Sequence, residues 1–242
     1  MFDETFLPIV MARPATSSAD VLNVAAFEPR SYVAGPGRRS VVWVAGCHRR
    51  CPGCSQPEFL TFNTGQQVPV SELWNRISKI ADIDGVCFSG GEPFEHVPPL
   101  AALARLVHES GLTVVSYSGY RLEALEANRQ RFGELLDEVD LLIDGEYRFD
   151  DKGEHRWRGS GNQRVHYLTN RIKPKDDDLP AREIQITLDG STVRFSGILS
   201  GDLVNLIRSN LQQHGFPSAP IDASFASVIP SDDNNGDNDA SR

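Results

Sequence analysis

The chain has 242 residues, of which 40% are hydrophobic and 24% are charged, a composition typical of one soluble globular domain with some appended segments. Its formal net charge of −9 makes the surface acidic and repels phosphate backbones and anionic lipid, so we expect neither nucleic acid nor a membrane as the main partner. No apolar run approaches the roughly 20 residues of a membrane span, and the first residues are acidic where a signal peptide is basic, which predicts a cytoplasmic protein.

Composition divides the chain into four stretches. Residues 1–22 contain a short apolar patch interrupted by proline, and we expect them to be weakly ordered. Residues 23–170 carry the regular patterns of a folded core, and residues 171–222 form a predicted appendage. Residues 223–242 are polar and acidic and cannot bury enough apolar surface to fold, which predicts a disordered tail.

Within the predicted core, apolar runs of strand length alternate with segments of helical periodicity. The predicted strands cover 40–46, 85–90, 112–119 and 139–145, and the predicted helices cover 71–82, 99–111 and 121–138. We expect Ser71 to be an N-cap, Gly111 to end the second helix and Gly133 to break the third. The alternation predicts an α/β fold with a parallel sheet and right-handed crossovers.

A different pattern follows the charged, proline-containing stretch after residue 170. Alternating apolar residues on both sides of Asp189 and Gly190 predict a β-hairpin with a type I′ turn. Residues 202–215 have the periodicity of an amphipathic helix. Together these segments predict a small C-terminal β-β-α appendage.

Three of the four cysteines directly follow the first predicted strand, where Cys47, Cys51 and Cys54 form the pattern C-x3-C-x2-C. So close a group favours a metal site over a disulfide framework. A structural zinc ion needs four ligands, so His48 or Cys87 would have to complete its site. A 4Fe–4S cluster held by only three thiolates has one iron open to an exogenous ligand. Cys87 lies in the middle of a predicted strand, where a cysteine is more often a buried apolar residue.

A second motif, SGGEP, directly follows the second predicted strand. Gly90 and Gly91 let the backbone approach a ligand closely, and the carboxylate of Glu92 can accept hydrogen bonds from an ammonium group. Taken alone, the motif also fits a tight turn between a strand and a helix. Because the carboxyl ends of parallel strands meet at one edge of the sheet, we expect this motif and the cysteines to lie together there.

The two motifs in this order resemble the signature of the radical S-adenosylmethionine superfamily. The resemblance implies a partial (β/α)6-type open barrel with parallel strands, to which the appendage is added. It implies that the three cysteines hold a 4Fe–4S cluster whose open iron binds the amino and carboxylate groups of S-adenosylmethionine. It also implies that the methionine amino group is bound by the segment of Gly90, Gly91, Glu92 and Pro93.

Further cofactor-binding residues follow from the same resemblance. Gly53 and Ser55 flank the third cysteine, and the backbone of the residue at position 53 usually contacts the adenine. Many members of the superfamily have an aromatic residue where this chain has Gly53. Ser118 and Asp144 end the third and fourth predicted strands at the same edge, where they are expected near the ribose and the methionine, with ordinary roles in turns as the alternative.

Five segments narrow the resemblance to one subfamily. The segments 35–54, 89–93, 117–120, 140–147 and 157–168 are similar to those of the single-cluster enzymes that activate anaerobic ribonucleotide reductase. Two features depart from that pattern. Ser55 stands where those activases usually have tyrosine, and this chain continues well beyond the segment at which they end.

The resemblance implies that a reduced cluster cleaves S-adenosylmethionine to a 5′-deoxyadenosyl radical, which then abstracts a hydrogen atom. No catalytic residue beyond the cluster is expected. The expected substrate is a glycine of a glycyl-radical protein, and the expected electron donor is a flavodoxin or a ferredoxin. The alternatives are a radical enzyme that modifies a small molecule or peptide, as epimerases of natural-product biosynthesis do, and, more remotely, a zinc-binding module.

Overall fold

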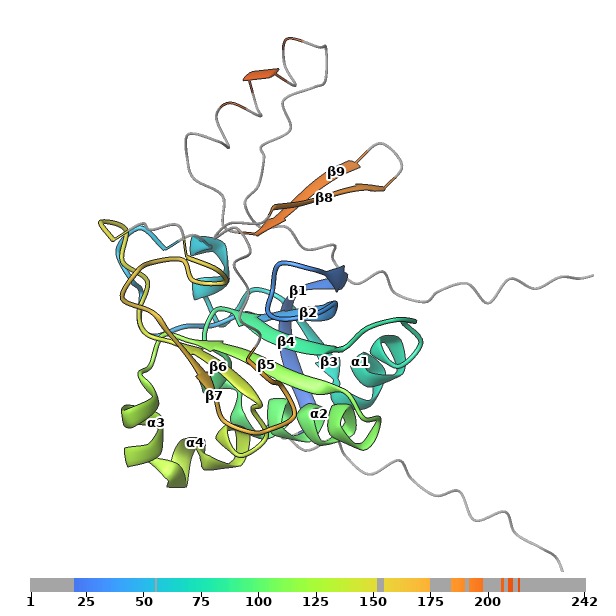
Figure 1. The fold of residues 1–242 in the computed structure, drawn as a ribbon, viewed down its shortest axis with the longest axis vertical. Helices are drawn as coiled ribbons and strands as arrows, with labels where there is room; N and C mark the ends of the chain where they lie inside the picture. The colour runs from blue at the N-terminus through green and yellow to red at the C-terminus, as the bar shows by residue number, and fades with distance from the viewer. Residues whose placement is uncertain are drawn as a thin grey trace, which may run out of the picture.

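The computed structural model describes residues 20–54, 56–151, 155–174, 184–189, 192–197, 206, 209–210 and 213 (Figure 1). Its main feature is a seven-stranded sheet with the strand order β3-β1-β2-β4-β5-β6-β7. The strands are β1 (Val21–Ser31), β2 (Arg39–Val44), β3 (Gln66–Pro69), β4 (Gly85–Gly90), β5 (Thr113–Ser118), β6 (Leu141–Asp144) and β7 (Arg164–Tyr167). The helices are α1 (Val70–Ile77), α2 (Val97–Glu109), α3 (Leu122–Ala127) and α4 (Arg129–Leu136), with 3₁₀ turns η2 (Pro57–Leu60) and η3 (Pro93–Glu95).

The centre of the sheet is parallel and its flanks are antiparallel. Strands β2, β4, β5 and β6 run parallel to one another. Strand β1 is antiparallel to β2 and β3, and β7 is antiparallel to β6. The predicted α/β class with a parallel sheet is therefore confirmed. The described strands make a mixed sheet, so a partial (β/α)6 barrel of parallel strands alone is not confirmed.

The four predicted core strands are all present, and β4 has the predicted bounds. Both faces of β2 are buried, which explains its continuous apolar sequence. The sequence did not predict β1, β3 or β7. Strand β1 begins at Val21, which lies inside the segment 1–22 for which we expected weak order, because it pairs with β2 on one side and β3 on the other.

The helices differ from prediction mainly at their ends. Helix α1 begins at Val70 with Pro69 as its N-cap, so the expectation that Ser71 is the N-cap was wrong. Gly111 follows α2 with φ of +76°, as predicted for the residue that ends that helix. The third predicted helix is divided at Asn128, where the backbone leaves the helical region, and not at Gly133, which is buried inside α4.

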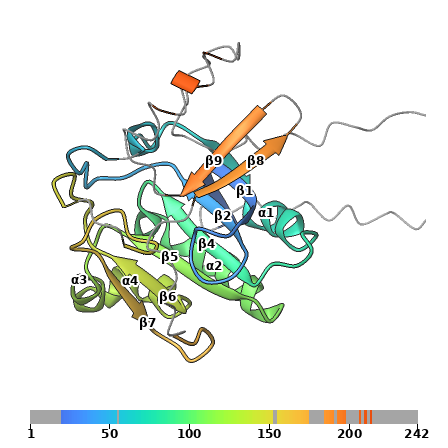
Figure 2. The same cartoon turned by 45° about the horizontal axis from the view of Figure 1, so that its top comes forward.

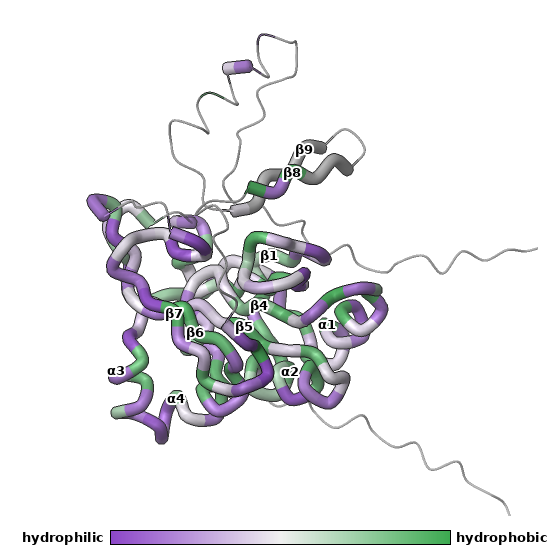
Figure 3. Tube along the Cα trace, viewed as in Figure 1, coloured by the Kyte–Doolittle hydropathy of each residue, from purple (hydrophilic) through white to green (hydrophobic). Residues whose placement is uncertain are grey.

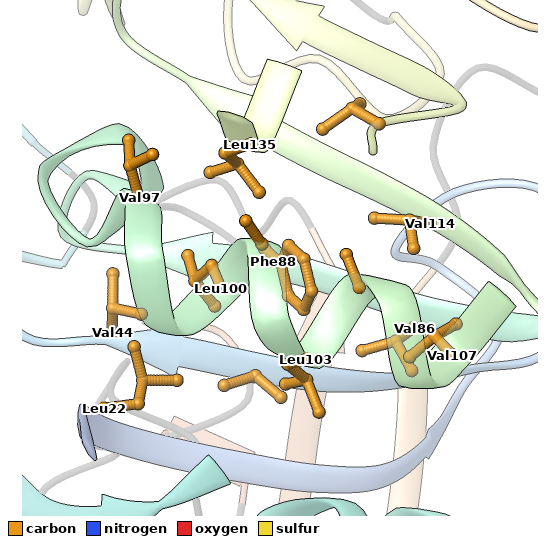
Figure 4. Close-up of a cluster of buried hydrophobic side chains, with 14 of the residues drawn as sticks. Leu22, Val44, Val86, Phe88, Val97, Leu100, Leu103, Val107, Val114 and Leu135 are labelled. Atoms are coloured by element: carbon orange, nitrogen blue, oxygen red, sulfur yellow. The ribbon is translucent and has the colours of Figure 1, made fainter. Parts of the chain in front are cut away.

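Apolar side chains cover both faces of the sheet. On one face α1, α2 and α4 pack against the strands, and Figure 4 shows Leu100 and Leu103 of α2 close to Phe88 of β4. On the other face a smaller cluster contains Cys87 and is covered by residues of loops, including Ile172. In Figure 3 the apolar colour follows the strands while the connecting loops are mostly polar. In parallel sheets ligands bind at the carboxyl ends of the strands, so the loops that follow β2, β4, β5 and β6 are the expected place for a cofactor site.

The predicted hairpin is present as β8 (Ile184–Asp189) and β9 (Thr192–Gly197). It lies beyond β1, away from α1 and α2 (Figures 1 and 2). The Gln185 amide connects it to β1, accepting from the Tyr32 N–H at 2.8 Å and donating to the Arg30 carbonyl at 2.7 Å. Gly190 of the predicted turn lies outside the described residues, and the described positions within 202–215 are helical. None of the described helices has the length and apolarity needed to cross a membrane.

Candidate functional site

The cysteine pattern lies on the loop that leaves the end of β2. Cys47 is buried, Cys51 and Cys54 are partly buried, and all three are free thiols. The loop is held to η2, because the Cys47 N–H donates to the Leu60 carbonyl at 3.1 Å. The Cys54 N–H closes a turn on the Cys51 carbonyl at 3.1 Å. Three reduced sulfur donors thus stand on one short, anchored loop.

Backbone N–H groups of the same loop point at the sulfur atoms. Burial raises the pKa of the Cys47 thiol, and hydrogen bonds from the backbone N–H groups of Arg49 and Arg50 partly offset that effect. Burial also raises the pKa of Cys54, against a backbone hydrogen bond from Gln56. Hydrogen bonds of this kind stabilise thiolates and the sulfur ligands of clusters.

The thiols fit a 4Fe–4S cluster better than a zinc ion. Among the described residues no group of three metal-binding side chains is close enough to hold one ion. A cluster does not need such a group, because each thiolate binds a different iron. The two candidate fourth ligands for zinc are engaged elsewhere. Cys87 is buried inside β4, where burial raises its pKa to about 12, and the His48 imidazole lies 3.4 Å from the Glu95 carboxylate.

The SGGEP motif is hydrogen-bonded to the beginning of the cysteine loop. The Gly91 N–H donates to the Val44 carbonyl at 2.7 Å, and the Glu92 N–H donates to the Gly46 carbonyl at 2.9 Å. A Cβ atom on Gly91 would lie 2.4 Å from the Gly46 oxygen, so a larger residue cannot take this position without moving the loop. The two motifs therefore form one unit, as their places after neighbouring strands predicted.

The Glu92 side chain turns away from solvent toward the end of β5. Its carboxylate accepts hydrogen bonds from the Ser118 hydroxyl at 2.9 Å, the Gly119 N–H at 2.7 Å and the Phe94 N–H at 3.1 Å. Burial raises its pKa to about 7, although these hydrogen bonds and the nearby Arg49 act in the opposite direction. Pro93, the next residue, is buried. The carboxylate thus joins the loops after β4 and β5.

Ser118 and Asp144 lie at the predicted edge, and their side chains hold neighbouring loops. The Ser118 hydroxyl, besides donating to Glu92, accepts from the Tyr120 N–H at 3.0 Å. The buried carboxylate of Asp144 accepts from the Leu122 N–H at 2.6 Å and from Arg164 Nε at 3.0 Å. Burial raises the pKa of Asp144, but hydrogen bonds from Arg164 and Leu122 outweigh burial and lower it overall.

Gly53 is exposed on the cysteine loop, with φ of +69°, a conformation that favours glycine. A Cβ atom there would lie 2.9 Å from the side chain of Phe149. Ser55 lies outside the described residues. Phe149 was not singled out from the sequence, since it lies almost a hundred positions away in the connection between β6 and β7.

A cavity of about 270 Å³ opens beside the cysteine loop. It is lined by Arg49, Gly119, Tyr120, Arg121, Ala124, Glu146, Arg148 and Asn162. Arg49 lies between Cys47 and Cys51 in the sequence, and its guanidinium group lies 3.2 Å from the Glu146 carboxylate. Three guanidinium groups against one carboxylate favour an anionic group in this cavity. Glu146 and Arg148 were not predicted as site residues, although they follow β6 as SGGEP follows β4. Their position after a parallel strand could have indicated them, because ligands bind at the carboxyl ends of such strands.

The segment 160–163 fixes the chain that leaves β6. Four hydrogen bonds join residues 160–163 to residues 145–151. The Arg148 N–H donates to Ser160 Oγ at 3.1 Å, and the Gly161 N–H donates to the Asp151 carbonyl at 2.8 Å. The side-chain amides of Asn162 and Gln163 donate to the carbonyls of Glu146 and Gly145, each at 2.9 Å. Residues 145–151 are thereby held beside the cysteine loop. This gives a structural role to residues of the segment 157–168, one of the five segments that narrow the resemblance to one subfamily.

Comparison with known proteins agrees with the geometry. The 4Fe–4S single cluster domain family matches residues 33–166, which is more than half of the chain. The chain is 34% identical over 154 residues to the anaerobic ribonucleoside-triphosphate reductase-activating protein of Salmonella typhimurium, covering 59% of this chain and 96% of the relative. The protein of the same name from Escherichia coli K12 is 31% identical over 156 residues, with 61% and 99% covered.

A second kind of activase is also similar. The pyruvate formate-lyase-activating enzyme of Clostridium pasteurianum is 29% identical over 142 residues, covering 56% of this chain and 57% of the relative.

Proposed function

This chain belongs to the 4Fe–4S single cluster domain family and, within the radical S-adenosylmethionine enzymes, to the glycyl-radical activases, and on that basis we propose that it activates an enzyme like anaerobic ribonucleotide reductase. The observation that carries the proposal is the joining of the cysteine loop to the SGGEP motif by backbone hydrogen bonds at the carboxyl edge of the sheet. Activation consists of forming a radical on a glycine of the partner enzyme.

The chain uses a 4Fe–4S cluster and S-adenosylmethionine. When bound and reduced, the cluster supplies the electron that cleaves S-adenosylmethionine to methionine and a 5′-deoxyadenosyl radical. In our proposal Cys47, Cys51 and Cys54 hold the cluster. Burial raises the pKa of the Cys47 and Cys54 thiols, and hydrogen bonds from the backbone N–H groups of Arg49, Arg50 and Gln56 act in the opposite direction, in favour of the thiolates.

The SGGEP segment is proposed to bind the methionine end of S-adenosylmethionine. Its support is the close approach of Gly90 to the end of β2 and of Gly91 to Gly46, at the start of the cysteine loop. The buried Glu92, Ser118 and Asp144 are proposed to act by fixing this edge, since each carboxylate or hydroxyl is already bonded to a neighbouring loop. Fixed loops exclude water and hold the cofactor in one orientation.

We also propose that the parallel strands β2, β4, β5 and β6 are a shortened form of the partial (β/α)6 barrel. Four parallel strands suffice to place the cysteine loop after β2 and SGGEP after the adjacent β4. The partner's glycine would enter at the edge where these loops meet, beside the cavity lined by Arg121 and Arg148.

An acidic electron donor of the flavodoxin or ferredoxin type is proposed to dock on the cluster loop. Arg50 is exposed on that loop and offers a cationic contact, although the neighbouring segment carries exposed carboxylates, at Glu146, Asp150 and Asp151, as well as Arg148. Complementary charge speeds the encounter of such partners. The chemistry also requires a reducing compartment, which favours a cytoplasmic location.

An isotope experiment tests the proposed function. A candidate glycyl-radical enzyme with deuterated glycine is incubated anaerobically with this protein, S-adenosylmethionine and a reductant. Deuterium in the 5′-deoxyadenosine product, which is absent with the variant Cys51→Ala, is the expected result. Deuterium transfer only from an added small molecule or peptide would replace the activase function with the alternative radical enzyme.

A further inference from the structure

The two residues that connect β2 to Cys47 are hydrogen-bonded at every backbone N–H and carbonyl. The Ala45 N–H donates to the Asn23 carbonyl of β1 at 3.0 Å. The Gly46 N–H donates to a carbonyl of η2 at 2.8 Å, and the Gly46 carbonyl accepts from the SGGEP motif at 2.9 Å. The remaining group is the carbonyl of Ala45, a fully buried residue, and it is bonded by side chains.

Two side chains from different parts of the fold donate to the Ala45 carbonyl. The amide of Asn23, a buried residue of β1, donates to it at 3.1 Å and also donates to the Phe62 carbonyl at 2.8 Å. The His96 Nε2 atom lies 2.9 Å from the same Ala45 oxygen. Because a carbonyl oxygen only accepts, this histidine nitrogen carries a proton and donates. The residue two positions before the first cysteine is therefore fixed both from β1 and from the chain that leaves SGGEP.

His96 is the N-cap residue of α2, yet its side chain makes no capping hydrogen bond to that helix. The ring turns to Ala45 instead, and burial lowers its pKa, although the bond to Ala45 acts in the opposite direction. Its neighbour Glu95 has a carboxylate 3.4 Å from the imidazole of His48, which follows Cys47. The 3₁₀ turn after SGGEP thus contacts the chain both before and after the first cysteine.

We infer that His96 is a positioning residue, which acts through the Ala45 carbonyl to hold Cys47 where a cluster faces SGGEP. The inference rests on the proposed function, in which S-adenosylmethionine contacts both the cluster and that motif. A ligand that contacts two loops binds tightly only while both are in the correct relative position. Its apparent affinity is therefore reduced by the fraction of molecules in which they are not. The bond from His96 to Ala45 favours the correct position, because it ties the two loops to each other.

The test titrates cluster-loaded, unreduced protein anaerobically with S-adenosylmethionine and measures binding by calorimetry. His96→Leu removes the donor, while the Asn23 bond to the same oxygen keeps the loop able to load the cluster. The dissociation constant should rise about 2- to 10-fold, the range that loss of one hydrogen bond gives. His96→Gln, whose side-chain amide can donate, should restore the affinity. The rate of 5′-deoxyadenosine formation at saturating S-adenosylmethionine should not change, because the bound cofactor itself then holds the two loops together.

His108→Leu is the matched control. His108 lies at the other end of α2, where its ring nitrogens lie 3.1 Å from the Glu138 carboxylate and 3.0 Å from the Asp140 carboxylate. Its loss should cost stability and leave the affinity for S-adenosylmethionine unchanged, because none of these groups contacts the cysteine loop.

Three results separate the inference from the proposed function. If His96→Leu binds S-adenosylmethionine no more weakly than His108→Leu, or if His96→Gln binds as weakly as His96→Leu, the inference is wrong while the proposed function stands. Iron loading that is lost in His96→Leu and regained in His96→Gln would support the positioning of Cys47, and loss in both would contradict it. A cluster-loaded wild type that binds no S-adenosylmethionine overturns the proposed function as well.

Discussion

The hydroxyl of Ser118 donates a 2.9 Å hydrogen bond to the buried carboxylate of Glu92, which joins the end of β5 to the motif that follows β4. From the sequence, Glu92 was expected to accept from a bound ammonium group. In the structure its oxygens already accept from Ser118, Gly119 and Phe94. The residue therefore fixes the edge of the sheet on which the cofactor site is built.

Glu92→Ala should lower the free energy of unfolding by about 2 to 4 kcal/mol, because three buried donors lose their acceptor together. Glu92→Gln, which keeps one acceptor oxygen, should cost less. Anaerobic urea unfolding measures both, and Glu109→Ala at the exposed end of α2 is the control. Equal stability of Glu92→Ala and Glu109→Ala would contradict the joining role.

Alanine at Cys47, Cys51 or Cys54 should abolish the cluster, since each thiol binds a different iron. Cys87→Ala should retain it, because Cys87 is buried in β4 among apolar residues, and should cost only about 1 kcal/mol of stability. Iron and acid-labile sulfide content after anaerobic reconstitution checks this. Loss of iron in Cys87→Ala, or one zinc and no iron in the wild type, would refute the assignment.

Gly91→Ala should disrupt the site, because the added methyl group would lie 2.4 Å from the Gly46 oxygen and 2.8 Å from the Phe59 oxygen. Gly111→Ala is a matched control, since its φ is +76° and nothing lies within 4 Å of the added atom. The control should lose about 1 kcal/mol of stability and keep cluster and cofactor cleavage. Cleavage is measured as 5′-deoxyadenosine by chromatography, and unchanged cleavage by Gly91→Ala would show that the two loops are not one unit.

Asp144→Asn should destabilise the protein by about 1 to 3 kcal/mol at neutral pH, because Leu122 and Arg164 both donate to the lost carboxylate. The folded state lowers the pKa of Asp144, so this stabilisation is present above the ordinary aspartate pKa of about 3.9 and is lost as pH falls below it. A double-mutant cycle with Arg164→Ala measures the coupling. Additive effects of the two substitutions would show that the pair is not coupled.

The sequence predicted the parts of the fold that local patterns determine. The bounds of β4 were correct because an apolar run ends there in glycine, and the cysteine loop and SGGEP met because both follow parallel strands. Strand β1 was missed because one of its two partners, β3, is distant in sequence, so no local pattern indicates the pairing that places β1 inside the sheet. Asn128, and not Gly133, divides the third helix, because Gly133 is buried in the helix α4 that packs on the sheet.

The candidate site was predicted less completely, for a related reason. Residues on the motifs were found from spacing, but the directions of their side chains depend on contacts between strands. Glu92 turns to Ser118, and Asp144 turns to the start of α3, which no local pattern indicates. Phe149 reaches Gly53 across the fold, and only the structure brings those two residues together.

The central claim is that this chain forms a radical on a glycine of a partner enzyme. Its most direct test is electron paramagnetic resonance of a candidate glycyl-radical enzyme after anaerobic incubation with the reconstituted protein, reductant and S-adenosylmethionine. We predict a glycyl doublet that requires S-adenosylmethionine and is absent with Cys51→Ala. If 5′-deoxyadenosine forms and no doublet appears with anaerobic ribonucleotide reductase or pyruvate formate-lyase, while a small molecule or peptide consumes the cofactor, the activase assignment is contradicted.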